Sequence, residues 1–442
     1  MLKVLFSELK DRPELQKALK AFHFLGSERA IRIIIGFFIH TALARYLGPD
    51  GFGELTYIRQ IVLFFTVISF LGIDDIYVKK LVEDKENIKS IASEVFWLRL
   101  QLVFILFIIL SVFAYFNAKD STQLKGFLIA GASLFAWPFL SFEFVFQSRL
   151  QSKELFISRL NGYVLGSALR VLGIFYQSKV NFFILSYTLE DFVSSVYTTF
   201  RYLKEFGLKR MTKMSQATKQ LVYDCFPMLV VMAMGFAAKA ITMYFLRTYS
   251  SPRELGIYSV CATLIELWYF VPIAVSTALL PKLVESRIKD PKLFQSRVQY
   301  LYDICLWLGL GLVISVYLLG KIIISVLYGA KYQGAETTLF IMSVVAMLTA
   351  FGGSAQLKYL IIEGQQKSLA IFYSVFLLLH ALLLFYFQSN LNAELVTRLS
   401  LASFVSANLL MSIFNSKFRN SVKLYFMTIL FPVKIYRRLR AK

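Results

Sequence analysis

Basic side chains that could bind an anion lie inside long apolar segments of this chain. Arg29, Arg32 and His40 fall on one stripe of a helix, and Arg59 lies inside the following apolar segment. A charge at mid-bilayer costs on the order of 2.5–3.5 kcal/mol on insertion scales, so it usually faces a cavity or a partner. Arg32 and Arg59 therefore predict an anion-binding cavity. Arg29 has the alternative of reaching the membrane surface, and His40 that of packing as a neutral side chain.

Further along the chain, four more bases interrupt apolar segments: Arg170, Lys239, Lys358 and Arg398. Lys239 lies deepest, whereas Lys358 and Arg398 lie near segment ends and have the alternative of reaching the surface. Arginine binds phosphate through a planar fork of donors, and lysine binds it as a point charge. A set of these groups around water would suit an anionic headgroup.

Three carboxylates lie near the middle of apolar segments: Glu190, Asp191 and Glu266. Buried carboxylates can carry protons or bind Na⁺, so these residues are candidates for H⁺ or Na⁺ coupling. The alternative is an intramembrane ion pair with a neighbouring base. No cofactor is expected, because the sequence has no Walker A motif, and Cys225, Cys261 and Cys305 lack the spacing of metal ligands. The chain is therefore expected not to be an enzyme.

The segments that carry these groups predict an all-α polytopic membrane protein. The 442 residues are 57% hydrophobic, with a mean hydropathy of +0.62, which exceeds the usual apolar share of a soluble domain. A crossing helix needs about 20 residues. Twelve segments meet this length: 28–47, 54–74, 93–116, 124–146, 155–176, 181–201, 222–247, 256–280, 299–328, 336–361, 367–387 and 394–414.

The net charge of +21 is explained by the excess of Lys and Arg that membrane proteins carry in their cytoplasmic loops. No nucleic-acid partner is therefore expected. With the N-terminus inside, the longer basic loops all fall on the cytoplasmic side, and twelve spans place both termini there. The expected organisation is an amphipathic segment 1–26, a first lobe 27–201, a basic linker 202–221, a second lobe 222–414 and a basic interfacial tail 415–442. The basic ends would contact anionic membrane lipids.

Two short matches indicate an internal repeat. "PDGFG" begins at Pro49 and "PRELG" at Pro252, 203 residues later, and "KLVE" occurs at Lys80 and again at Lys282. Each match follows an equivalent span, so the two halves would have the same orientation. Parallel repeats of this kind build transporters with a site between two lobes.

The stretches "ARYLGPDGFGELTY" and "FLGIDDIYVKKLVED" resemble the beginning of bacterial Wzx-type polysaccharide flippases. These proteins belong to the multidrug/oligosaccharidyl-lipid/polysaccharide exporter superfamily, and residues 28 to about 90 match best. The resemblance implies two six-helix lobes around a central cationic cavity. It also implies a substrate in which an oligosaccharide, such as an O-antigen repeat unit, is carried on undecaprenyl pyrophosphate.

The same resemblance implies a bacterial cytoplasmic (inner) membrane location and a polysaccharide polymerase and chain-length regulator as partners. Three alternatives remain open from the sequence. A lipid II flippase would use the same carrier, but that branch commonly has fourteen spans. A MATE-type exporter of cations would favour an acidic cavity. A membrane polysaccharide polymerase would be expected to have a large outer loop, whereas the outer loops here are short.

Overall fold

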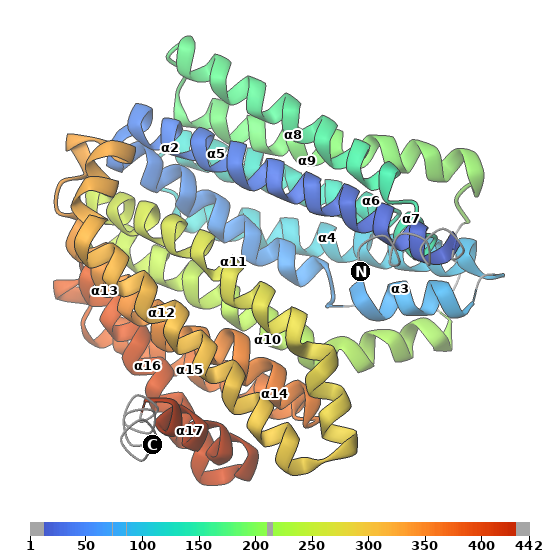
Figure 1. The fold of residues 1–442 in the computed structure, drawn as a ribbon. Helices are drawn as coiled ribbons and strands as arrows, with labels where there is room; N and C mark the ends of the chain where they lie inside the picture. Colours follow the sequence, from blue (N-terminus) through green and yellow to red (C-terminus); the bar gives the residue numbers. More distant parts are fainter. Residues whose placement is uncertain (1–12, 73, 85, 210–214, 430–442) are drawn as a thin grey trace, which may run out of the picture. The chain divides into compact units, whose positions relative to one another are not determined.

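The computed structural model describes residues 13–72, 74–84, 86–209 and 215–429, which are almost entirely helical (Figure 1). The chain divides into two compact units: Met1–Tyr46 with Ile58–Leu229, and Leu47–Tyr57 with Val230–Lys442. The lobe boundaries that the sequence predicts, 27–201 and 222–414, stay a prediction. Within the described residues the division by contacts falls inside one helix, α10 (Gln216–Tyr249).

The first unit is built on a set of long and short helices. They are α2 (Pro13–Ser69), α3 (Asp74–Glu83), α4 (Ile88–Asn117), α5 (Ser121–Ala132), η1 (Ser133–Ala136), α6 (Trp137–Leu140), α7 (Glu143–Ser148), α8 (Ser152–Phe175) and α9 (Val180–Glu205). The helices α8 and α9 pack against each other along their lengths, and α9 also contacts α5. This α8–α9 pair carries Arg170, Glu190 and Asp191, which are considered below.

The first two predicted spans lie in α2, which consists of two helices joined at the non-helical residue Gly48. Gly48 has φ 68° and ψ 179°, a conformation that glycine adopts without the steric penalty of a Cβ atom. Pro49 follows, and its fixed φ suits the first turn of a helix. The "LGPDG" stretch therefore bends the chain between two apolar helices without a separate loop.

The second unit contains most of α10 and the remaining helices. They are α11 (Pro252–Lys289), α12 (Pro291–Tyr328), η2 (Ala330–Tyr332), α13 (Ala335–Ala350), the π-helical η3 (Phe351–Gln356), α14 (Leu357–Ile362), α15 (Gln366–Tyr386), η4 (Gln388–Asn390), α16 (Ala393–Phe414) and α17 (Ser416–Ile429). The amphipathic α17 packs on α16 and α12, and its Phe418 joins a buried apolar cluster.

The prediction of an all-α polytopic membrane protein is confirmed, because each of the twelve predicted segments is helical in the structure. In the described part of the chain, nine helices are long and apolar enough to cross a membrane. The difference from twelve has two sources. α2, which contains two predicted spans, counts once, and the two predicted spans in α8 and α9 are not apolar enough over any such stretch to be counted.

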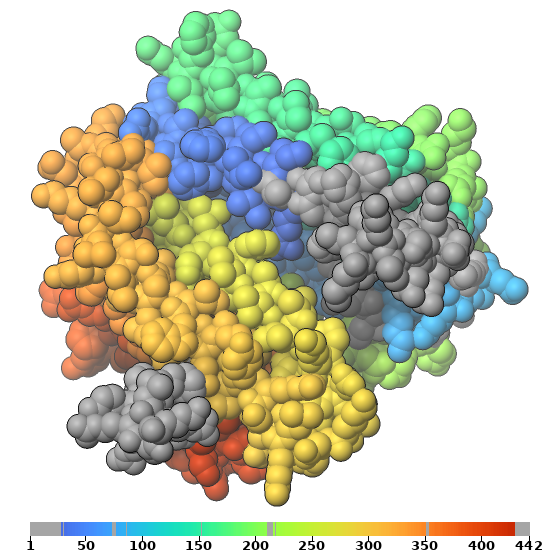
Figure 2. All heavy atoms as spheres, in the orientation of Figure 1, coloured from blue at the N-terminus to red at the C-terminus, as the bar shows by residue number. Residues whose placement is uncertain are grey.

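The outer surface of the second unit is apolar, as contact with lipid requires. The helix α12, whose spheres run from yellow to orange in Figure 2, carries the exposed side chains Trp307, Ile314, Tyr317, Leu318 and Ile322. An exposed apolar surface of this extent would be unusual on a soluble monomer. It is expected where hydrocarbon replaces water as the solvent.

The repeat detected in the sequence reappears inside the second unit. The Thr56 hydroxyl donates to the Ser259 hydroxyl at 2.7 Å, and these residues are 203 positions apart, the offset between Pro49 and Pro252. Both residues lie in the second unit, and the contact joins the two turns that the sequence match pairs. The contact therefore supports an internal repeat of related structural halves.

Two predicted segments lie partly outside the described residues. They are the amphipathic N-terminal segment, of which residues 1–12 are not described, and the basic tail, of which 430–442 are not described. Two basic residues of the linker, Arg210 and Lys213, also lie outside them.

Candidate functional site

A buried ion pair joins α8 to α9 in the first unit. The guanidinium of Arg170 donates to the Glu190 carboxylate at 2.6 Å and to the Ser167 hydroxyl at 3.3 Å. The Arg170 side chain is only 2% exposed, and that of Glu190 is 11% exposed. A buried pair of this kind fixes two helices in one register, because removal of either partner leaves an uncompensated charge.

Two small residues make room for this ion pair. A Cβ atom on Gly166 would lie 2.6 Å from a Glu190 carboxylate oxygen, and one on Gly162 would lie 2.7 Å from the Ser194 backbone nitrogen. Gly162 and Gly166 form a Gly-x-x-x-Gly pattern, which lets membrane helices approach closely. The close approach of α8 and α9 thus places the Glu190 carboxylate beside Arg170.

Arg32 adds a third helix, α2, to the cluster. Its guanidinium lies 3.2 Å from the Glu28 carboxylate and 3.9 Å from that of Glu190. The Tyr163 hydroxyl of α8 donates to the Arg32 carbonyl at 3.2 Å, which ties the two helices together. Unlike Arg170, Arg32 keeps 42% of its side chain exposed. It therefore remains accessible to a ligand.

Arg59 joins the cluster because its guanidinium contacts the face of an aromatic ring. Its guanidinium carbon lies 3.4 Å from the centre of the Tyr187 ring on α9, and that of Arg170 lies 4.1 Å from the same ring. Tyr187 thus supports two cations through their attraction to its π-face. Asp191, the next residue after Glu190, interacts electrostatically with Arg59, Arg32 and Arg170.

Arg32, Arg59 and Arg170 therefore face three carboxylates, those of Glu28, Glu190 and Asp191. With all six ionised, the cluster has no net charge. A second pair lies nearby, because the Arg159 guanidinium donates to Glu143 at 2.9 Å and Glu143 interacts with Glu28 and Arg32. The first unit thus contains a network of alternating charge in which Arg32 and Arg59 are the most accessible of its three central cations.

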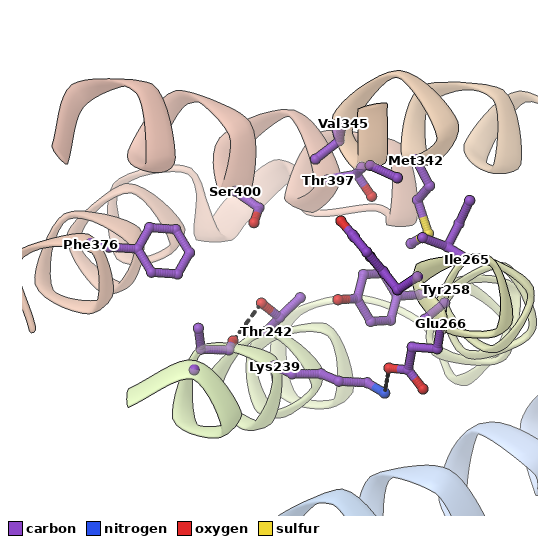
Figure 3. Close-up of a pocket in the computed structure, with 15 residues that line it drawn as sticks. Lys239, Thr242, Tyr258, Ile265, Glu266, Met342, Val345, Phe376, Thr397 and Ser400 are labelled. Carbon is purple, nitrogen blue, oxygen red and sulfur yellow. Dashed lines mark hydrogen bonds and ion pairs between the residues drawn. The ribbon is translucent and has the colours of Figure 1, made fainter. Parts of the chain in front are cut away.

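The second unit holds a separate cavity of about 310 Å³, bounded by α10, α11, α13, α15 and α16 (Figure 3). Lys239 of α10 and Glu266 of α11 form an ion pair at its edge. Lys239 is 28% exposed and Glu266 is 56% exposed, so both groups are open to a ligand. The sequence leaves two roles open for Glu266, namely ion coupling or an ion pair with a neighbouring base. The structure contains such an ion pair.

His380 lies close to this cavity but is fully occupied. One ring nitrogen lies 2.7 Å from the Thr242 hydroxyl, and the other lies 3.4 Å from the Ser403 hydroxyl. The ring stacks on Phe376 with a centroid distance of 5.9 Å. His380 therefore packs the wall behind Thr242.

The remaining predicted site residues lie on α2, α14 and α16. Arg398 is 63% exposed and pairs with Glu394 in the first turn of α16. Lys358 is half-buried in α14. Arg29 is exposed and His40 half-buried on α2. Within the described ranges, no group of three His, Cys, Asp or Glu side chains could hold a metal ion.

Three contributors to the first-unit cluster were missed by sequence reasoning: Glu28, Tyr163 and Tyr187. The sequence contains one signal that could have located the cluster, namely the Gly162–Gly166 pattern in a charged apolar helix, because it marks a close helix partner. Tyr187 lies one helical turn before Asp191, on the face of α9 that carries the carboxylates.

The sequence also matches a known protein family. The model of a family described as "Polysaccharide biosynthesis protein" matches residues 19–286, which is more than half of the chain. The match includes the whole first-unit cluster and the Lys239–Glu266 pair. No curated protein sequence matches significantly.

Solved structures share the fold at low sequence identity. The lipid II flippase MurJ in an inward closed conformation has a TM-score of 0.69 and 16% identity, over 93% of this chain and 92% of that chain. An inward-facing multidrug resistance MATE family transporter has a TM-score of 0.63 and 12% identity, over 89% and 98%. A transporter of the MOP superfamily from Pyrococcus furiosus has a TM-score of 0.60 and 14% identity, over 93% and 95%.

Proposed function

The chain belongs to the polysaccharide biosynthesis protein family, and from this membership we propose that it is a flippase for lipid-linked oligosaccharides. The substrate would be an oligosaccharide repeat unit on undecaprenyl pyrophosphate, moved across the bacterial cytoplasmic membrane by alternating access. The observation that carries this proposal is the placement of Arg32 and Arg59. Both lie on α2 beside a buried structural ion pair, where Arg32 is exposed and Arg59 is half-buried.

These two arginines suit a pyrophosphate better than a cationic ligand. A guanidinium presents parallel N–H donors that match two phosphate oxygens. Among the described residues, the Glu28 carboxylate lies closest to the Arg32 guanidinium, at 3.2 Å, and the contact with Glu190 is longer, at 3.9 Å. A pyrophosphate could therefore take over donors of Arg32 while Arg170 continues to hold Glu190 in place.

Charge balance supports coupling of transport to protons. The six central groups carry no net charge when ionised, so a pyrophosphate would add negative charge to a neutral cluster in a poorly polarisable medium. Uptake of a proton by Asp191 would offset part of this charge and leave arginine donors for the substrate. We propose H⁺ in preference to Na⁺, because Arg170 already occupies Glu190.

The flipping proposal is tested by reconstitution into liposomes. The probe is a fluorescent polyprenyl pyrophosphate that carries one N-acetylglucosamine, and flipping is followed by the loss of protection from an impermeant quencher. Arg32→Ala and Arg59→Ala should each lower the flipping rate at least about tenfold, the effect of losing one charge-assisted contact of roughly 1.5–3 kcal/mol. The matched control is Arg201→Ala, which removes a 45% exposed arginine of the same unit. Unchanged flipping in both variants would refute the role of the cluster.

The coupling proposal has its own measurement. An imposed proton gradient should change the initial rate of flipping in the same liposomes, and a sodium gradient of equal size should not. Asp191→Asn should abolish the response to the proton gradient. A response to sodium alone would overturn the choice of ion and leave the flippase proposal intact.

The cell biology that we propose follows from the substrate. The protein would work in the inner membrane with both termini cytoplasmic, next to a polymerase and a chain-length regulator that use the translocated unit. In a strain that lacks the gene, surface polysaccharide should be lost, and expression of the wild-type protein should restore it. Restored export of a cationic drug without restored polysaccharide would instead indicate a MATE-type exporter.

A further inference from the structure

The cavity of the second unit has a chemistry that differs from the arginine cluster. Its volume of about 310 Å³ lies at the lower end of the range of roughly 300–1,000 Å³ for small-molecule pockets. Its charged groups are one base and one acid in contact, so the cavity offers no net charge. It is too small for a whole oligosaccharide and unsuited to a pyrophosphate, which would face Glu266.

The Lys239–Glu266 pair presents a donor and an acceptor side by side. A carboxylate only accepts hydrogen bonds and an ammonium only donates them, whereas a hydroxyl group does both. Two neighbouring hydroxyl groups on one ring could therefore bridge the pair, with one donating to Glu266 and the other accepting from Lys239. A sodium ion is a poorer fit, because the ammonium already occupies the carboxylate.

The other walls of the cavity match the rest of a sugar ring. In Figure 3, Ser400 and Thr397 lie opposite the Lys239–Glu266 pair. The Tyr258 ring lies between the ion pair and these two side chains. The Ser400 hydroxyl has no hydrogen-bond partner among the described residues, so it is available to a ligand. Tyr258, Tyr269 and Phe376 supply aromatic surface against which the apolar face of a sugar can pack.

We propose that this cavity binds one uncharged sugar unit, a hexose or an N-acetylhexosamine, of the lipid-linked glycan. The proposal rests on the flippase function: the arginine cluster recognises the pyrophosphate that all such carriers share, and the cavity reads a sugar. The Lys239–Glu266 pair orients the ring hydroxyls, and the aromatic wall excludes ligands without an apolar face.

Gly235 allows the cavity to be blocked without disturbing the surrounding helices. It lines the cavity, and a Cβ atom built on it meets nothing within 4 Å. Gly235→Leu should therefore fill the binding space and leave the fold intact. Gly311→Leu is the matched control, because Gly311 is also an exposed helical glycine of the second unit with nothing within 4 Å, and it does not line the cavity.

The experiment measures binding of short-chain polyprenyl pyrophosphates to the purified full-length protein in detergent. One probe has no sugar, and three others carry glucose, galactose or N-acetylglucosamine. The wild-type protein should bind at least one sugar-bearing probe about tenfold more tightly than the sugar-free probe. Gly235→Leu should remove this difference without changing the affinity for the sugar-free probe, and Gly311→Leu should preserve it. A double variant, Lys239→Met with Glu266→Leu, keeps the side-chain bulk, removes both charges and should also lose the difference.

The outcomes separate the sugar site from the flippase function. Equal affinity of the wild-type protein for all four probes would overturn the sugar site while leaving pyrophosphate recognition standing. Equal weakening of all probes by Gly235→Leu would also overturn it, because the cavity would then serve the carrier instead of the sugar. No binding of any probe by the wild-type protein would overturn both proposals.

Discussion

Replacement of Gly256 by alanine should destabilise the protein through a backbone clash. A Cβ atom at this position would lie 2.1 Å from the carbonyl oxygen of Pro49 and 2.6 Å from two other Pro49 backbone atoms. The backbones would have to separate by about 0.9 Å to reach even 3.0 Å, the limit below which real Cβ contacts essentially never occur. Overpacking typically costs about 1–3 kcal/mol, and alanine recovers about 1 kcal/mol of helix propensity. Because the opposing atoms are backbone and cannot change rotamer, we expect a net loss of about 2 kcal/mol.

The assay is thermal unfolding of the purified protein in detergent, with a graded series of glycine variants. Gly256→Ala should lower the melting temperature most. Gly53→Ala should have a smaller effect, because its Cβ atom would lie 2.8 Å from the Gly256 nitrogen. Gly311→Ala, in open space, should cause no loss. A Gly256→Ala protein as stable as the Gly311→Ala protein would refute the close contact between the two repeat-related turns.

Three further predictions concern single contacts. Arg170→Met should destabilise the protein by about 3–5 kcal/mol, because it leaves Glu190 buried without its main partner, and Arg170→Met combined with Glu190→Leu should recover most of the melting temperature. Thr56→Val should lower stability by about 1 kcal/mol through loss of the 2.7 Å hydrogen bond to Ser259, while Thr122→Val on the first unit should not. Glu94→Ala should increase tryptic cleavage of the 202–221 linker in inside-out vesicles. The reason is that the Glu94 carboxylate accepts hydrogen bonds from the Ser215 backbone N–H at 3.1 Å and from the Ser215 hydroxyl at 2.6 Å. Unchanged cleavage would show that this contact does not anchor the linker.

Most of the fold could be predicted because span length and loop charge are local properties of the sequence. The twelve segments and their helical state follow from apolar runs of sufficient length. The break between the two helices of α2 could also be predicted, because the glycine and proline of "LGPDG" favour a turn or a kink. The inclusion of Leu47–Tyr57 in the second unit depends on close packing with Gly256, which no local pattern reveals.

The candidate site could be predicted only as a set of charged residues. Arg32, Arg59 and Glu190 were identified because charge inside an apolar segment is rare. Their pairing could not be predicted, since it depends on which faces of α2, α8 and α9 meet. The sequence leaves open whether the carboxylates pair with neighbouring bases, whereas the structure places Arg32 3.2 Å from Glu28 and Arg170 2.6 Å from Glu190.

The two helices that look least suited to a membrane are the ones that build the first-unit cluster. The helices α8 and α9 are not among the described helices that are apolar enough to span, although both are regular and pack tightly together. Their charged groups satisfy one another across a glycine-lined contact, so the helix pair can be stable where each helix alone would be poor. A pyrophosphate that binds Arg32 must compete with the Glu28 carboxylate for the Arg32 guanidinium. Glu28 therefore occupies, in the absence of substrate, donors that the substrate would use. Glu28→Gln should therefore strengthen binding of the sugar-free pyrophosphate probe, and weaker binding would contradict this competition.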